Sequence, residues 1–207
     1  MWRQKIFSLI LTKPLFKIHV SGVENIHKSR RPFLIIANHK TIFDFFALGN
    51  CIPISSKLSP SMIIGEGEFF NNSILQFLHR IGFIKILYCF LGVLPVTRGR
   101  NLDECLKAPI ELLQKKGVVL IHPEGYIIKG DRIGKFKRGA PYMAIKTGVQ
   151  ILPIIFRPGQ RTCKLSLRRN FYVTIGEPFT LPRGTSVENG AEIMRKTVTE
   201  LYNSNLV

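Results

Sequence analysis

The stretch Arg31-Pro-Phe-Leu-Ile-Ile-Ala-Asn38 is the clearest indication of the fold in this chain. Its five central residues are apolar and mostly branched, and a proline and an asparagine bound them. A short apolar run with such residues on both sides is typical of a buried β-strand. The other segments of the chain can be placed outward from this strand.

Similar apolar runs recur along the chain, and segments with a helical period separate them. We expect further strands at residues 91–97, 118–122, 149–156, 163–167 and 170–176. We expect helices at residues 41–49, 73–90, 102–116, 140–147 and 187–202. Strands that alternate with helices predict an α/β fold, a single layered domain with a mostly parallel central sheet flanked by helices.

The first twenty residues have a different pattern. The apolar run Ile6–Leu11 is too short to span a bilayer, which needs about 20 apolar residues. Its apolar side chains have helical spacing, and basic residues surround them, which is typical of a basic amphipathic helix. We expect residues 1–20 to form such a helix, either in a membrane interface or packed on the core, and residues 21–207 to form the main domain.

The composition narrows the class of protein. The chain has 207 residues, the size of one domain, with 30 Lys and Arg against 13 Asp and Glu and a formal net charge of +17. Hydrophobic residues make up 45% of the chain, so the charge does not indicate disorder. A surface this basic favours an anionic partner, which is a nucleic acid, an acidic membrane or a small phosphorylated substrate.

The four cysteines are scattered along the chain. They are Cys51, Cys89, Cys105 and Cys163, and no two of them have the spacing of a zinc site. In a chain long enough to have its own core, such cysteines are expected to be reduced core residues. Their pattern favours a reducing, cytoplasmic compartment.

A polar cluster follows the strand at residues 31–38. His39 leaves the strand, and Asp44 stands in the first turn of the next expected helix, so that the two side chains can meet. A carboxylate on one imidazole nitrogen fixes the tautomer and leaves the other nitrogen as a general base. Taken alone, this cluster is also compatible with a loop histidine and an ordinary helix cap.

Two more polar clusters follow expected strands. Arg98 and Arg100 come after the strand at residues 91–97, and arginine forks suit phosphate oxygens. Glu124 and Gly125 come after the strand at residues 118–122. Ligands of open α/β sheets bind outside the carboxyl ends of the strands. The segment from Lys129 to Arg169 then holds eleven Lys or Arg and a single acid.

These clusters together resemble the glycerolipid acyltransferase family, the PlsC-like 1-acyl-sn-glycerol-3-phosphate acyltransferases. Four sequence blocks of that family occur in the right order from about residue 32 to 156. The blocks are Asn38-His39 with Asp44, Gly92 with Val96 and Arg98, Pro123-Glu124-Gly125 leading to Phe136–Ala140, and Val149–Ile155 with its internal Pro153.

The resemblance implies a reaction and roles for these residues. His39 would be the general base for an acceptor hydroxyl, and Asp44 would orient it. The hydroxyl of lysophosphatidic acid would attack the thioester carbonyl of acyl-CoA or acyl carrier protein directly, giving phosphatidic acid. Arg98, Glu124 and Gly125 would hold the phosphorylated acceptor. The resemblance implies no metal, and no cofactor beyond the acyl-CoA or acyl carrier protein co-substrate.

The same resemblance resolves the ambiguity of the charge. It implies a peripheral or monotopic enzyme on the cytoplasmic face of the cell membrane, with residues 21–207 as the acyltransferase domain. An anionic membrane surface and a lysophospholipid are then the expected partners, and nucleic acid is not. A less favoured alternative is a non-catalytic basic module that binds membranes or nucleic acid.

The chain departs from the family pattern after Gly125. The family usually continues with threonine and a phosphate-binding arginine, whereas this chain has Tyr126 and Ile127. Either another cation substitutes, or the acceptor is glycerol 3-phosphate or another lysophospholipid. The candidate substitutes are Arg100, Lys129, Arg132 and Lys137. His122 replaces a common aromatic, and a residue at the end of a strand is more often structural than catalytic.

Overall fold

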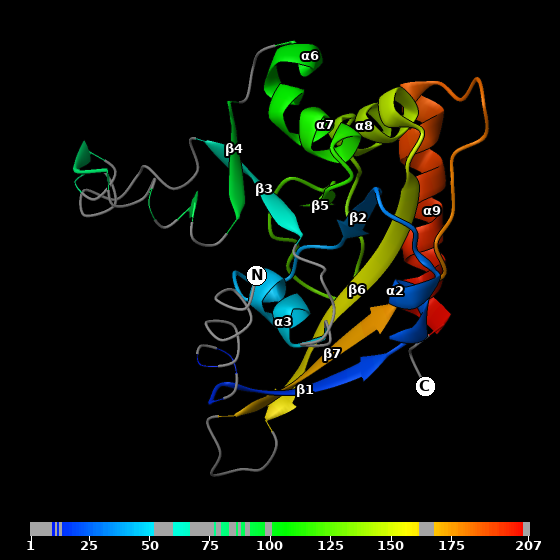
Figure 1. Ribbon diagram of the computed structural model, residues 1–207. Helices are drawn as coiled ribbons and strands as arrows, with labels where there is room; N and C mark the ends of the chain where they lie inside the picture. Colours follow the sequence, from blue (N-terminus) through cyan, green and yellow to red (C-terminus); the bar gives the residue numbers. More distant parts are fainter. Residues whose placement is uncertain are drawn as a thin grey trace.

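A seven-stranded sheet forms the centre of the described chain (Figure 1). The computed structural model describes residues 10, 12, 14–51, 60–66, 77, 80–82, 86, 88–89, 92–97, 101–161 and 168–204. The strands are β1 (Phe16–Ser21), β2 (Phe33–Ala37), β3 (Ser61–Glu66), β4 (Val93–Thr97), β5 (Val118–Ile121), β6 (Gln150–Arg161) and β7 (Arg169–Ile175). Their order is β1-β7-β6-β2-β5-β3-β4, and of the described strand pairs only β6 with β7 is antiparallel. The predicted α/β fold with a mostly parallel sheet is confirmed.

Helices cover both faces of this sheet. Helices α2 (Glu24–Lys28) and α3 (Asp44–Cys51) supply one hydrophobic cluster. Helices α7 (Lys107–Gln114), α8 (Gly139–Thr147) and α9 (Val187–Ser204) supply a second cluster on the other face. The short helix α6 (Leu102–Cys105) precedes α7. The result is the three-layered arrangement that a parallel sheet needs in order to bury both faces.

Strand β2 is the buried strand that the sequence indicates. All five of its residues are buried, and it pairs with β5 on one side and with β6 on the other. Its side chains alternate between the two clusters, with Phe33, Ile35 and Ala37 in the first and Leu34 and Ile36 in the second. This alternation follows from the period of two in a strand. The segment that follows β2 therefore starts from the best-anchored part of the sheet.

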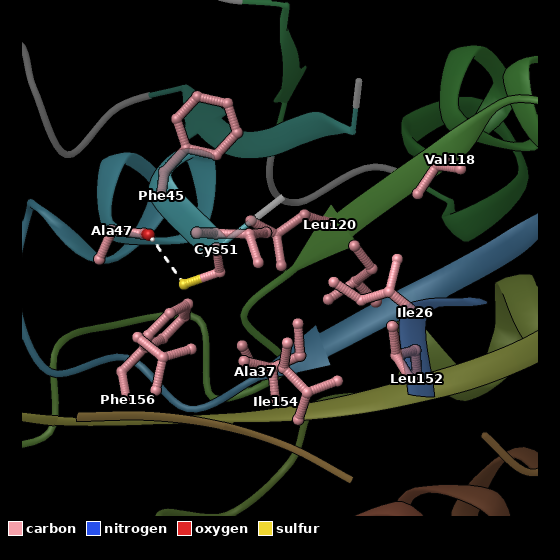
Figure 2. Packing of buried hydrophobic residues seen from close by; sticks show 14 of the residues in the cluster. Ile26, Ala37, Phe45, Ala47, Cys51, Val118, Leu120, Leu152, Ile154 and Phe156 are labelled. Carbon is pink, nitrogen blue, oxygen red and sulfur yellow. Dashed lines mark hydrogen bonds between the residues drawn. The ribbon is translucent and has the colours of Figure 1, made fainter. Parts of the chain in front are cut away.

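Figure 2 shows the first cluster, where α3 packs over the sheet near Phe156. The Cys51 thiol donates a hydrogen bond to the Ala47 carbonyl over 3.1 Å, and burial raises the pKa of Cys51 to about 12. Cys51 is therefore the core residue that we expect. Cys89 is exposed, so the expectation is wrong there, and Cys163 lies outside the described residues.

The structure corrects the expected N-terminal helix in its last residues. Phe16–Val20 belong to β1, which pairs in parallel with β7 at the edge of the sheet, so the boundary expected after residue 20 falls inside a strand. Apolar Phe16, Ile18 and Val20 alternate with Lys17 and His19, which is a strand period. Residues 1–9, 11 and 13 lie outside the described part of the chain.

Most other expected elements are present with shifted ends. The helix expected at 102–116 is divided at Leu106 into α6 and α7, whereas the one expected at 140–147 ends at Gly148 as predicted. Strand β3 and helix α2 are additional to the prediction. The strand expected at 163–167 and most of the helix expected at 73–90 lie outside the described residues. Among the helices that are described, none combines the length and apolar character needed to cross a bilayer.

The register of β2 and β5 decides where the polar clusters lie. Ile36 of β2 is paired in parallel with Ile121 of β5, so both strands end at the same edge of the sheet. His39 follows the first strand, and Glu124 follows the second. The clusters around these two residues, 85 positions apart in the chain, therefore lie side by side.

The Asn38 side chain continues the pairing of β2 with β6 after the backbone ladder ends. Its amide donates to the Phe156 carbonyl over 2.9 Å, and its carbonyl accepts from the Phe156 N–H over 2.7 Å. We expect Asn38→Ala to lower the free energy of unfolding by about 2–5 kcal/mol, because two buried backbone groups lose their partners. Urea unfolding measures this. Asn189→Ala, at an exposed position of α9, is the control, and an equal loss in both variants would argue against this role of Asn38.

Candidate active site

The site is built around a hydrogen bond between His39 and Asp44. His39 Nδ1 lies 2.9 Å from Asp44 Oδ2, and the Asp44 side chain is almost fully buried whereas that of His39 is 23% exposed. A carboxylate only accepts, so His39 Nδ1 donates its N–H, and Nε2 carries the lone pair. The expected pairing of these two residues is therefore present. It leaves one imidazole nitrogen available as a base.

The turn between His39 and helix α3 holds the Asp44 carboxylate in place. Asp44 accepts from the Lys40 N–H at 2.7 Å, from the Thr41 N–H at 3.1 Å, and from the Thr41 hydroxyl at 2.8 Å. Thr41 Oγ1 in turn accepts from the Phe43 N–H at 3.0 Å. The sequence Thr-x-x-Asp thus forms reciprocal caps at the start of α3, close to the capping box that it resembles. These donors hold the carboxylate facing the imidazole.

Glu124 holds the backbone of His39 from the end of the neighbouring strand. Its Oε2 accepts from the His39 N–H at 2.8 Å, and its Oε1 accepts from the Gly134 N–H at 2.6 Å. The residue is fully buried. Burial raises the pKa of Glu124, while the two N–H donors and the nearby Lys40 oppose that rise. The structure therefore gives Glu124 a positioning role, and its expected contact with an acceptor stays a prediction.

The loop after Pro123-Glu124-Gly125 is fastened around the His39 turn. The Ile128 N–H donates to the His39 carbonyl at 2.8 Å. Lys40 Nζ donates to the carbonyls of Gly130 and Arg132 at 2.8 and 2.7 Å, and burial lowers the pKa of Lys40. These bonds hold residues 128–132 beside His39 without using the Arg132 side chain, which is exposed.

Gly125 and Lys137 lie in close contact at the same turn. Gly125 has a φ of 76°, and a Cβ added there would lie 2.7 Å from Lys137 Nζ. The Lys137 ammonium also lies 5.4 Å from the centre of the Tyr126 ring, and its side chain remains largely exposed. Of the described cations proposed as substitutes, Lys137 thus lies against the Pro-Glu-Gly turn. Arg98 and Arg100 are outside the described residues.

His122 also lies in the site, although the sequence predicts only a structural role for it. Its ring stacks on His39 with a centroid separation of 4.2 Å and an angle of 14° between the planes. Its Nδ1 lies 3.1 Å from the Ala37 carbonyl and 2.9 Å from the Asn38 carbonyl. Burial, reinforced by His39, lowers the pKa of His122 to about 4. The sequence shows only that His122 follows an expected strand, and that position does not distinguish it from an ordinary residue at a strand end.

The geometry favours a hydrogen-bonded pair over a metal centre at this place. One ligand atom each from His39, Asp44 and His122 lies within 4.8 Å of the others, a spacing that can hold a metal ion. Imidazole lone pairs lie in the ring planes, so two nearly parallel stacked rings do not aim them at one point. The His39 Nδ1–H is also committed to Asp44.

Comparison with known proteins adds to this geometry. The family model described as Acyltransferase matches residues 17–157. A chloroplastic 1-acyl-sn-glycerol-3-phosphate acyltransferase of Arabidopsis thaliana is 34% identical over 72% of this chain and 38% of its own length. A 1-acyl-sn-glycerol-3-phosphate acyltransferase of Pseudomonas aeruginosa is 28% identical over 74% of this chain and 55% of its own length. The matched part of the chain thus spans less than two thirds of the length of these curated relatives.

A solved structure has the same fold. The PlsC acyltransferase of Thermotoga maritima, described as a 1-acyl-sn-glycerophosphate acyltransferase, aligns with a TM-score of 0.72 and 20% identity over 100% of this chain and 80% of that chain. The family model covers more than half of the chain, and it includes both strand ends that carry His39 and Glu124. On this match and the sequence identity to the Arabidopsis thaliana protein, the chain belongs to the Acyltransferase family.

Proposed function

We propose that this chain transfers an acyl group from an acyl thioester to the free hydroxyl of lysophosphatidic acid, giving phosphatidic acid. The observation that carries the proposal is the His39–Asp44 hydrogen bond of 2.9 Å at the carboxyl end of the central strand. The relatives with curated names are 1-acyl-sn-glycerol-3-phosphate acyltransferases, which supports this choice of acceptor. The donor is acyl-CoA or acyl carrier protein, and no further cofactor takes part.

The proposed chemistry needs one base and no covalent enzyme intermediate. His39 Nε2 takes the proton of the acceptor hydroxyl as its oxygen attacks the thioester carbonyl. The tetrahedral intermediate collapses when the carbon–sulfur bond breaks, and the leaving thiolate takes the proton back from His39. Asp44 keeps the Nδ1–H in place and stabilises the imidazolium between these two steps.

Lys137 is the cation that we propose for the acceptor phosphate in place of the missing arginine at position 127. Its ammonium lies over Gly125, at the turn whose Glu124 holds the His39 backbone. It makes no ion pair with the other described residues, so it has no acid to release when an anion binds. Arg98 and Arg100 remain proposed contributors from the end of β4. Glycerol 3-phosphate or another lysophospholipid is the alternative acceptor.

The loops beside the base also support a peripheral position on an anionic membrane. Ile42, Tyr126 and Ile127 are 65%, 48% and 39% exposed, although apolar side chains of this size are normally buried. Basic side chains at Lys129 and Arg132 stand in the same loop and are exposed as well. Apolar residues among cations suit an acidic lipid surface, where each cation contributes about 1 kcal/mol. A place on the cytoplasmic face of the cell membrane is part of the proposal.

The dyad is tested by substitution of either member. We expect His39→Ala and Asp44→Asn to lower the rate of acyl transfer by roughly 10²–10⁴, because the base is removed or loses its orientation. Thiol release from acyl-CoA in the presence of lysophosphatidic acid measures the rate. His27→Ala, on the exposed side of α2, is the matched control. Unchanged activity of His39→Ala would refute the proposed function.

The role of Lys137 is tested through the acceptor. We expect Lys137→Met to raise KM for lysophosphatidic acid by roughly 10-fold to 100-fold with little change in kcat, because a hydrogen bond to a charged group contributes about 1.5–3 kcal/mol. A monoacylglycerol acceptor, which lacks the phosphate, should show no such difference between parent and variant. Lys135→Met in the same loop is the control. An equal effect on both acceptors would argue against phosphate binding by Lys137.

Membrane binding is tested by the exposed apolar residues. We expect the double variant Tyr126→Ser and Ile127→Ser to bind vesicles of phosphatidylglycerol and phosphatidylcholine roughly tenfold more weakly in a sedimentation assay. The control is the double variant Ile145→Ser and Tyr172→Ser, at positions that are 40% and 43% exposed on other elements. Higher salt should weaken binding by the parent. Equal binding by the two double variants would show that this loop does not contact the lipid.

A further inference from the structure

The imidazole ring of His39, the proposed base, is stacked on the imidazole ring of His122. The rings of His39 and His122 come from the ends of two adjacent parallel strands, β2 and β5. Their centroids are 4.2 Å apart and their planes differ by 14°, so the rings are stacked and nearly parallel. The proposed chemistry uses His39 and Asp44 and assigns nothing to His122. A buried titratable ring in contact with the base therefore needs an explanation.

Backbone carbonyls fix both the position and the tautomer of His122. Its Nδ1 faces the carbonyl oxygens of Ala37 and Asn38 at 3.1 and 2.9 Å. Two oxygens that only accept require an N–H between them, so Nδ1 carries the proton and Nε2 carries the lone pair. Both carbonyls belong to the residues that directly precede His39. The His122 ring is thus fastened to the backbone that carries the base.

The surroundings of His122 favour its neutral form. The side chain is buried, its Nε2 has no hydrogen-bond partner among the residues that the structure describes, and the centre of the Phe156 ring lies 6.2 Å from that of His122. His39 opposes a positive charge on His122, whereas Asp44 and the two carbonyls favour one. Burial outweighs them, and the pKa of His122 falls to about 4. At neutral pH the base therefore lies against the face of an uncharged aromatic ring.

We propose that His122 is a positioning residue for His39. Its uncharged ring fixes the plane of the His39 imidazole and offers an aromatic face to the imidazolium formed during acyl transfer. The proton moves from the acceptor hydroxyl to His39 Nε2 and then to the leaving thiolate, while His122 keeps its own proton on Nδ1. A cation within about 6 Å of an aromatic ring centre is attracted to the ring face, and offset-stacked aromatic pairs attract each other as well. The inference rests on the proposed acyl transfer.

Two substitutions separate the aromatic face of His122 from its N–H. His122→Phe keeps a face and loses the donor to the carbonyls, whereas His122→Gln keeps an N–H and loses the face. We expect kcat to fall about tenfold in His122→Gln and to stay within about threefold in His122→Phe, with KM for both substrates within about twofold. The rates are referred to the folded fraction measured by circular dichroism.

A merely structural His122 gives the opposite order. The donor to Ala37 and Asn38 would then matter most, so that His122→Gln would keep its kcat and His122→Phe would lose it. That outcome overturns the inference, and so does an equal kcat in both variants. If either variant fails to fold, a measurement on the parent protein alone still tests the inference.

Nitrogen NMR of histidine-labelled parent protein provides that measurement. We expect His122 to show the Nδ1–H tautomer and no titration between pH 5 and pH 8. An Nε2–H tautomer, or a titration near pH 6.5, would overturn the inference even if the enzyme is active. If the parent has no acyltransferase activity, the proposed function fails, and the kinetic role inferred for His122 fails with it. The NMR result then reports only on the packing of the two rings.

Discussion

The buried carboxylate of Glu124 is the constraint on which the site depends. It joins the end of β5 to the end of β2 through the His39 N–H and to the following loop through the Gly134 N–H. A carboxylate is costly to bury, and burial indeed raises the pKa of Glu124. Hydrogen bonds from two backbone donors offset that cost, and they are stronger than bonds between neutral groups. His39, the proposed base, is thereby held through its backbone as well as through its ring.

Other contacts around His39 also fix its position. Asp44 fixes one ring nitrogen, His122 lies against the ring face, and Ile128 donates to the His39 carbonyl. These partners come from the start of α3, the end of β5 and the loop after it. General-base catalysis requires the acceptor hydroxyl and the base to meet in one geometry. The fixed backbone, tautomer and ring plane of His39 suit the role of base that we propose for it.

The local part of this site could be predicted from the sequence, whereas the non-local part could not. His39 and Asp44 are five positions apart across a strand end and a helix start, so the pattern of a buried run followed by a cap already brings them together. The contact of Glu124 with His39 spans 85 positions and depends on β2 lying next to β5. Strand order is not encoded in the local periodicity. For the same reason His122 resembles an ordinary residue at the end of a strand. The helix predicted for residues 1–20 includes most of β1, because the residues before Phe16 have helical spacing. The alternation of apolar and polar residues that indicates a strand begins only at Phe16.

The fate of the acceptor oxygen shows whether the hydroxyl of lysophosphatidic acid is the nucleophile. The purified chain is mixed with acyl-CoA and lysophosphatidic acid whose free hydroxyl carries oxygen-18, and the lipids are analysed by mass spectrometry. If the acceptor hydroxyl attacks the thioester, the phosphatidic acid retains the label in its new ester and forms in step with thiol release. Free fatty acid without labelled phosphatidic acid would contradict the proposed attack, because water and not the acceptor hydroxyl would then be the nucleophile.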